Sequence, residues 1–286
     1  MLASALGLAL AGRVLRPLRS LATTAGRITD TDLSQRIPVS GNDEASQIAA
    51  TFNEMLERLE QAFSAQRVFL DDTSHELRTP LTVIRGHLEL LELDEDPEER
   101  RQTIELVTDE IDRMNEIVND LFLLARSEQP DFLSTESIDL SSLIVGVHQK
   151  VSVLAPRDWR LTEPPSVRLD GDRHRLTQAL LQLSDNAVRH TDDGDRIAIG
   201  AAVSGGEAVL WVDDSGHGVP PEVAERIFDR FQRGPSGPSG ATGGGLGLAI
   251  VAAIAEAHGG RAALVTRPGP GARFEISLPL RSGDQS

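Results

Sequence analysis

The sequence predicts a multidomain protein in which two α-helical modules precede an α/β sandwich. The chain has 286 residues, which is too long for one ordinary domain and sufficient for two or three. Apolar stripes with heptad spacing lie within residues 65–130, as in coiled coils and four-helix bundles. From about Asp131 the pattern changes to short β-like runs between helices, which predicts an α/β domain over residues 131–286.

Residues 1–12 are interpreted as the end of a transmembrane helix. Their apolar run, MLASALGLALA, is shorter than the approximately 20 residues that a helix needs to cross a bilayer. Arginines follow it at once, at positions 13, 16 and 19, as on the cytoplasmic side of a membrane span. A buried N-terminal helix is the alternative, but length and flank favour the membrane. We therefore expect location at the inner (plasma) membrane, with the remainder of the chain in the cytoplasm.

The residue pattern of 13–64 predicts a helix, an extended connector and a second helix. The first helix carries apolar residues at Val14, Leu18, Leu21 and Ala25. The connector RIPVSGND contains a proline and a glycine, which disfavour a helix there. Acidic residues at 43 and 44 suit the N-terminal end of the second helix, whose apolar stripe is Ile48, Phe52, Met55 and Leu59.

Residues 65–130 predict a long helical hairpin around the acidic turn DEDPEE. Its first apolar seam is Leu77, Leu81, Ile84, Leu88 and Leu91, and its second is Ile104, Val107, Ile111, Met114, Val118 and Leu121. Two helices with two seams cannot close a bundle core alone. A homodimer that supplies four helices is the simplest solution.

The C-terminal part predicts four strands, at residues 196–203, 207–214, 261–265 and 273–280. Helices are expected over 173–190 and 246–257. The formal net charge of −16 argues against general binding to nucleic acid, which requires clustered basic residues. The absence of cysteine excludes disulfides and thiolate metal sites.

The segment FLDDTSHELRTPLT contains a candidate nucleophile, His75. His75 precedes the seam residue Leu77 by two positions, or about 200° of helix rotation, so it is expected to face solvent. A neutral imidazole is a nitrogen nucleophile near neutral pH. Glu76 can hold one ring nitrogen protonated, and Thr79 shares the face of His75. An ordinary surface histidine is the alternative interpretation.

Three further segments carry residues suited to a nucleotide. In QLSDNAVRHT, the amide oxygen of Asn186 is a hard, neutral ligand suited to Mg²⁺. In DSGHG, the Asp214 carboxylate can accept a hydrogen bond from an exocyclic amine, and the glycines permit a tight turn. In GGGLGLAIV, glycines precede a helix whose N-terminal N–H groups can hold an anion. The signature G-K-[ST] of a P-loop is absent.

Together these segments resemble those of the sensor histidine kinase family. FLDDTSHELRTPLT is similar to its H-box, and QLSDNAVRHT is similar to its N-box. DSGHG is similar to its G1 box, and GGGLGLAIV is similar to its G2 box. IFDRFQR, which contains Phe228 and Phe231, is similar to its F-box. Residues 13–64 resemble a HAMP signalling module. The resemblance implies a Bergerat-type (GHKL) ATP-binding fold, shared with gyrase, heat-shock-chaperone and mismatch-repair ATPases, over residues 131–286.

The resemblance also implies the function and its residues. ATP with Mg²⁺ would phosphorylate His75, and a response-regulator receiver domain would accept the phosphate on an aspartate. Glu76 and Thr79 match a family pattern that implies a reverse role in dephosphorylating the regulator. The nucleotide-binding residues implied are Asn186, also the metal ligand, Arg189, His190, Asp214, Gly216, Gly218, Gly243, Gly245, Gly247 and Leu248. The composition of the Gly/Pro/Ser-rich run 234–245 predicts a flexible lid, and a plain linker is the alternative interpretation.

One position departs from the family pattern, because Gln182 stands where the family usually has a first asparagine. Two other functions stay open. A mechanical ATPase of the same superfamily would lack the H-box, which this chain has. A catalytically inactive scaffold would be expected to lose residues such as His75 and Asn186, which this chain retains.

Overall fold

The computed structural model describes residues 34–39, 44–91, 96–127, 129–232, 245–265 and 270–280. The interpretations of residues 1–12, of the first helix of the 13–64 module and of most of the run 234–245 lie outside these ranges. Residue contacts divide the chain into two units, residues 1–75 and 76–286. Each unit is described separately below.

In the first unit, the predicted connector is extended over residues 34–39, alongside helix α2 (Glu44–Leu91). The Asn53 side chain accepts a hydrogen bond from the Ile37 N–H at 2.9 Å and donates one to the Ile37 carbonyl at 3.0 Å. Ile37 is buried, as are Ala49 and Leu56 one helical turn to either side of Asn53. One asparagine therefore satisfies both backbone groups of a residue that has no strand partner.

The apolar stripe predicted for this helix differs from the face that the single chain buries. Ile48, Met55 and Leu59 are 52%, 46% and 40% exposed, whereas Ala49 and Leu56 are 2% exposed. Among the described residues, the connector covers the second face and leaves the first exposed. The stripe thus still needs a partner, as an apolar surface of this length does.

Helix α2 is continuous across the boundary expected between the modules at residues 64 and 65. Residues 57–79 contain neither glycine nor proline, so nothing in the local sequence ends the helix. The helix also continues through the buried Pro80, which cannot donate a hydrogen bond to the Glu76 carbonyl.

Helix α3 (Pro97–Arg126) forms the second arm of the predicted hairpin. Proline occupies its first position, and the Asp96 side chain caps it by accepting from the Glu98 N–H at 2.9 Å. On both helices, alternate residues of the predicted seams are exposed by about half. These are Leu81 at 54%, Leu88 at 50%, Ile104 at 50% and Ile111 at 46%.

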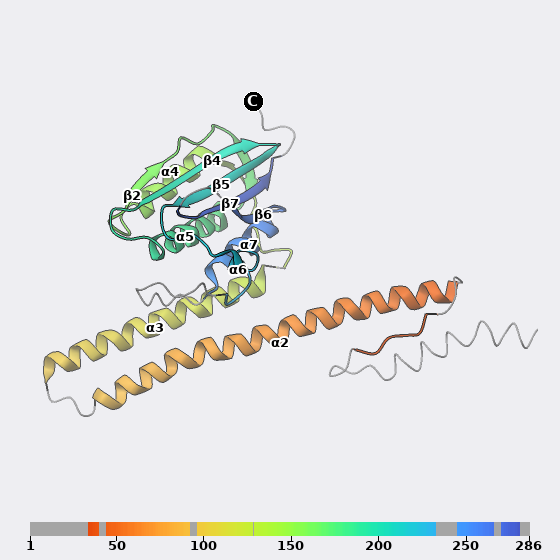
Figure 1. Cartoon of the computed structure of the whole chain (residues 1–286), viewed down its shortest axis with the longest axis horizontal. Coiled ribbons are helices and arrows are strands. Elements are labelled where there is room, and N and C mark those ends of the chain that lie inside the picture. Colours follow the sequence, from red (N-terminus) through yellow and green to blue (C-terminus); the bar gives the residue numbers. More distant parts are fainter. Residues whose placement is uncertain are drawn as a thin grey trace, which may run out of the picture. The chain divides into compact units, whose positions relative to one another are not determined.

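The α/β part confirms the predicted fold class (Figure 1). The four predicted strands are β4 (Arg196–Ser204), β5 (Glu207–Asp214), β6 (Arg261–Val265) and β7 (Arg273–Pro279), and the two predicted helices are α5 (Arg173–Arg189) and α7 (Gly247–Ala257). Five other elements of this part were not predicted from the sequence. They are β1 (Glu136–Asp139), α4 (Leu140–Val151), β2 (Asp158–Leu161), β3 (Arg168–Gly171) and α6 (Pro221–Ala224).

The main sheet has the order β2-β4-β5-β7-β6, in which β2 is parallel to β4 and the other pairs are antiparallel. Strands β1 and β3 form a separate antiparallel pair. A two-residue turn with positive φ at Gly205 (61°) and Gly206 (81°) connects β4 to β5, as tight hairpins require.

Helices α4, α5 and α7 pack on one face of this sheet, and their apolar residues form one core with alternate residues of the strands. The strand residues in this core include Ile197 and Ile199 of β4, Leu210 and Val212 of β5, and Ile276 and Leu278 of β7. On the opposite face, side chains of neighbouring strands pack against one another. There the Arg273 guanidinium lies 4.2 Å from the Trp211 ring centre. The result is a two-layer sandwich.

A polar hub joins the beginning of α5 to the end of α7. Asp172 caps α5 by accepting from the Arg175 N–H at 3.0 Å, and it also accepts from the Ser134 N–H at 2.9 Å. The Asp172 N–H donates to His258 Nε2 at 2.9 Å, and His258 Nδ1 lies 2.7 Å from the Ile254 carbonyl. These partners require the neutral ring with its proton on Nδ1. Burial lowers the pKa of His258 accordingly.

Candidate functional site

His75 lies on α2 with an exposed side chain, as its position beside the seam predicts. Thr79, one turn later, is also exposed, and Glu76 is half-buried. Leu77 points the other way and packs against the apolar core of the second unit. The rotation predicted from Leu77 is confirmed, and a large partner can reach the imidazole.

The N-box segment forms the C-terminal half of α5. Leu183, Ser184 and Ala187 face the core and are essentially buried, which leaves Asn186 half-buried at the edge of the domain. Arg189 follows in the last turn, and its Nε donates to Asp185 at 2.8 Å. This exposed i,i+4 pair is weak enough for Arg189 to exchange partners.

The G1 segment places a buried carboxylate at the end of β5. Asp214 is 3% exposed, and its Oδ1 accepts from the N–H groups of Gly216 at 2.9 Å and Ala272 at 3.2 Å. Within the described residues both hydrogen bonds to this carboxylate fall on Oδ1, so Oδ2 remains available to a ligand. Burial raises the pKa of the Asp214 carboxyl, and the two N–H groups act in the opposite direction.

The floor around this carboxylate consists of backbone without side chains. A Cβ atom on Gly216 would lie 1.9 Å from the His190 carbonyl oxygen, and one on Gly271 would lie 2.0 Å from the Asp214 carbonyl oxygen. Gly218 has a φ of 76°, which favours glycine. These glycines are therefore required by close backbone approach, as the DSGHG pattern predicted for Gly216 and Gly218.

The N-box and the G1 box meet directly at this point. His190 caps the C-terminal end of α5, and its carbonyl contacts Gly216. Next to this contact, Arg196 and Ser215 exchange two hydrogen bonds of 3.0 Å. Burial lowers the pKa of His190, and the charges of His217 and Arg189 lower it further, so its ring favours the neutral form. Arg189 is consequently the better partner for a phosphate.

Phe231, which precedes the glycine-rich run, lies beside Gly245, the last residue of the run. Gly243 falls outside the described residues, but the Phe231 N–H donates to the Gly245 carbonyl at 2.9 Å. Gly245 has a φ of 66°, and Phe231 has a φ of 60°, which is unusual for a side chain of its size. Gly247 begins α7, and Leu248 packs on the core. Leu246 provides no side-chain cap, so within the described residues the N–H groups of the first turn are open to an anion.

Three family models match this chain. The model for the histidine kinase-, DNA gyrase B- and HSP90-like ATPase matches residues 171–282, and that for the His Kinase A (phospho-acceptor) domain matches residues 65–130. The model for the HAMP domain matches residues 9–61. The order of the three matches along the chain agrees with the order of the predicted modules.

The relatives with similar sequences include the probable sensor histidine kinase TcrY of Mycobacterium tuberculosis, which is 35% identical over 97% of this chain and 63% of its own. The sensor protein CutS of Streptomyces coelicolor is 36% identical over 98% of this chain and 69% of its own. The chain therefore spans roughly two thirds of the length of these relatives. This chain belongs to the sensor histidine kinase family.

Solved structures agree with this assignment to the kinase family. The structure of full-length ShkA in complex with AMPPNP is 32% identical and aligns with a TM-score of 0.53, over 72% of this chain and 44% of that one. The described part of this sensor kinase contains no helix that is long and apolar enough to cross a membrane. The transmembrane interpretation of residues 1–12 lies outside that part and stays a prediction.

Gln182, where this kinase departs from the family pattern, lies against the beginning of α7. Its Oε1 would be 2.7 Å from a Cβ atom on Gly247. The longer side chain of glutamine thus reaches the first residue of the G2 helix, where a Cβ atom would require the flexible end of Gln182 to move. Gln182 therefore contacts the predicted phosphate-binding end of α7.

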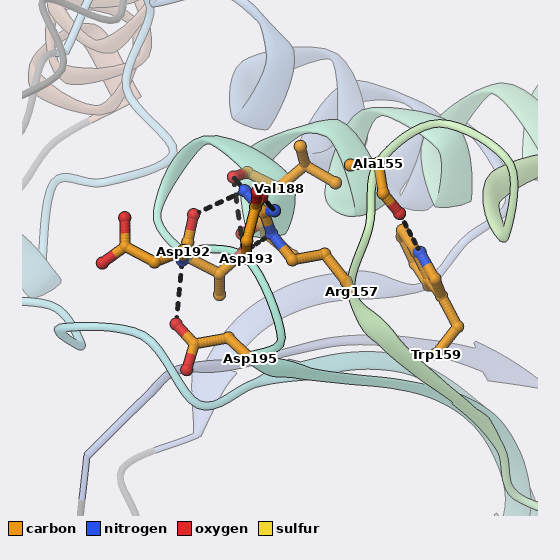
Figure 2. Close-up of polar contacts among 9 residues, drawn as sticks. Ala155, Arg157, Trp159, Val188, Asp192, Asp193 and Asp195 are labelled. Carbon is orange, nitrogen blue, oxygen red and sulfur yellow. Dashed lines mark hydrogen bonds and ion pairs between the residues drawn. The ribbon is translucent and has the colours of Figure 1, made fainter.

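The sequence did not indicate several residues that hold this site together. Arg157 binds the end of α5, Gly271 and Ala272 contact Asp214 from the turn just before β7, and His258 joins α7 to Asp172 (Figure 2 shows the Arg157 contacts). Each acts on a partner distant in the chain. The only local signal was the glycine pair GPG before β7, which marks a turn but names no partner.

Proposed function

We propose that this chain is a protein histidine kinase, which transfers the γ-phosphate of ATP to His75 and then to an aspartate of a response regulator. The buried Asp214, with an available oxygen above a floor of glycines, is the observation that carries the nucleotide site. Membership of the sensor histidine kinase family supports the phosphoacceptor role of the exposed His75. ShkA, which binds AMPPNP, supports an adenine nucleotide.

The residues fit adenine better than guanine. Asp214 Oδ2 can accept a hydrogen bond from the adenine amino group, whereas guanine has a carbonyl oxygen at that position, which a carboxylate repels. The absence of side chains on Gly216, Gly218 and Gly271 lets the backbone segments around Asp214 approach one another closely. The phosphates would reach Arg189 and the N-terminal end of α7.

The residues also fit Mg²⁺ that arrives with the nucleotide. The described part of the chain contains no cluster of three His, Asp, Glu or Cys side chains that could hold a metal alone. Asn186 supplies one neutral oxygen, and Mg²⁺ commonly takes its remaining ligands from phosphates and water. When bound, the ion would neutralise charge on the phosphates.

In the reaction, a ring nitrogen of His75 attacks the γ-phosphorus while the bond to the β-phosphate oxygen breaks and ADP leaves. The phosphorylated His75 ring is then cationic, and the proton on its other ring nitrogen passes to water. Glu76 would stabilise the positive charge that develops on the imidazole during attack. Catalysis rests mainly on positioning and charge neutralisation, as in other phosphoryl transfers.

Further proposals concern the context of this reaction. Leu81, Leu88, Ile104 and Ile111 form exposed, heptad-spaced positions, which supports a homodimer through the hairpin. Thr79 and Glu76, beside His75, would orient water to dephosphorylate the response regulator. HAMP-containing relatives support attachment to the plasma membrane, with the catalytic part in the cytoplasm.

Labelling with γ-labelled ATP and Mg²⁺ tests the main proposal. Wild-type chain should acquire acid-labile label, His75→Gln should acquire none, and His87→Gln, on the same helix, should label normally. Because His75 is exposed, its replacement should change the unfolding free energy by at most about 0.5 kcal/mol and leave ATP affinity intact. Label that persists in His75→Gln places the phosphoacceptor elsewhere, and an absence of label on wild type together with ATP hydrolysis indicates an ATPase.

A further inference from the structure

Arg157, in the loop between α4 and β2, inserts its guanidinium group at the C-terminal end of α5 (Figure 2). Its Nη2 donates to the carbonyl oxygens of Thr191 at 2.8 Å and Val188 at 3.4 Å, and its Nε donates to Thr191 Oγ1 at 3.0 Å. Nη1 also donates to the Asp193 carboxylate. Only 10% of the side chain is exposed. Arg157 lies outside the segments that the family models match.

The carbonyl contacts, rather than the ion pair, account for this burial. Asp193 is 79% exposed, and an ion pair with a solvated carboxylate contributes little. The last carbonyls of a helix lack intrahelical partners and carry partial negative charge. A guanidinium donates hydrogen bonds to these oxygens, and its positive charge offsets their partial negative charge. Its planar, forked donors allow one side chain to reach three oxygens.

The turn that Arg157 holds is the turn that forms the nucleotide site. Asn186 and Arg189 lie within one turn of Val188, and the His190 carbonyl contacts Gly216 of the G1 box. After Thr191 the chain is fixed again, because the Gly194 N–H donates to the Pro156 carbonyl at 3.0 Å and the Asp158 N–H donates to the Asp195 carbonyl at 2.8 Å. The loop that carries Arg157 and the end of α5 therefore form one connected support.

We propose that Arg157 is a positioning residue for nucleotide binding, which acts by fixing the end of α5 against the G1 turn. This proposal rests on the proposed kinase function. Arg157 touches neither Asn186 nor Asp214, and its effect passes through the backbone of residues 188–191. Loss of the guanidinium removes its hydrogen bonds to the Val188 and Thr191 carbonyls and to Thr191 Oγ1, which lets the turn that carries Asn186 and Arg189 move relative to Asp214.

Arg157→Met removes the donors but keeps the length of the side chain. Arg160→Met is the matched control, because Arg160 lies three residues later, is 62% exposed and pairs only with Asp158 in the described structure. Titration of each full-length variant with ATP and Mg²⁺, at a temperature where circular dichroism shows it folded, gives the affinity. We expect about tenfold weaker binding for Arg157→Met, as small displacements of binding groups produce, and wild-type affinity for Arg160→Met.

Kinetics separate positioning from a purely structural role. The KM for ATP should rise in Arg157→Met, while labelling of His75 at saturating ATP returns toward the wild-type rate. A folded Arg157→Met protein with wild-type affinity overturns the proposal. If Arg157→Met does not fold, Arg157→Lys replaces it, because an ammonium keeps the charge but cannot reach three oxygens, and wild-type affinity there overturns the proposal equally. Failure of wild-type protein to bind ATP refutes the proposed function instead.

Discussion

Replacing Gly216 with alanine tests whether the N-box and the G1 box form one site through backbone contact. The new Cβ atom would lie 1.9 Å from the His190 carbonyl oxygen. An ordinary van der Waals contact requires about 3.4 Å, so the two segments must separate by about 1.5 Å. Both partners are backbone, so no side-chain rotation can relieve the conflict.

Two effects of different kinds should follow from this separation. Overpacking costs about 1–3 kcal/mol, and a conflict between backbone atoms belongs at the upper end, which lowers the Tm of a domain of this size by about 6–12 °C. The separation also moves His190 and Asn186 away from Asp214. A displacement of this size should weaken the binding of ATP with Mg²⁺ by about tenfold or more, because the groups that hold the nucleotide no longer match it.

Gly205→Ala is the control for this experiment. Gly205 has a φ of 61° and open space around it, at the opposite end of the β4–β5 hairpin from Asp214. Alanine there costs about 1 kcal/mol of backbone strain but moves nothing near the site. Thermal unfolding and titration with ATP and Mg²⁺ compare the two variants. Equal Tm and equal affinity in Gly216→Ala and Gly205→Ala would refute the proposed contact between the boxes.

Two more predictions concern the hairpin and the polar hub. Leu88→Glu should convert a dimer to a monomer in light scattering, because Leu88 lies on the seam. Leu90→Glu should leave the dimer intact, because Leu90 lies off the seam, although it is about as exposed in the single chain (54%) as Leu88 (50%). The unfolding free energy of the wild type should fall as pH drops from 6.5, the ordinary pKa of histidine, toward the lower pKa of His258 in the folded chain. In this range His258 is protonated in the unfolded chain only, which favours unfolding. Denaturant titrations at several pH values should show a smaller decrease in His258→Gln, and an unchanged pH dependence would contradict the assignment.

The long elements were predictable because their periodicity is strong and local. Strands β4, β5 and β7 alternate apolar residues that face one core, and α5 and α7 bury one stripe each. Strands β1, β2 and β3 have four residues each and carry charged side chains, so no period can be recognised in them. Helix α2 was predicted as two helices because the modules were separated by function, although nothing in the local sequence breaks the helix there.

The chemistry of the candidate site was predictable for a similar reason, because each motif keeps its reactive residues within a few positions. Asp214 and Gly216 interact with each other two residues apart, and His75 and Thr79 share a face one turn apart. The partners that complete the site are distant. Ala272 reaches Asp214 across 58 residues, and His258 reaches Asp172 across 86. Such pairs depend on the topology of the sheet, which no local pattern encodes.

Arg157 and Arg160 show most directly why local sequence is insufficient. They stand three residues apart in RDWR, each within two residues of Asp158, and residue type and spacing give no reason to rank one above the other. The structure separates them, because Arg160 pairs with Asp158 in solvent, whereas Arg157 is buried at the end of α5. The difference arises from the end of α5 and from Thr191, 34 residues further on, whose oxygens lie within reach of Arg157. The need of a distant helix end, rather than any property of the RDWR segment, therefore determines which arginine supports the nucleotide site.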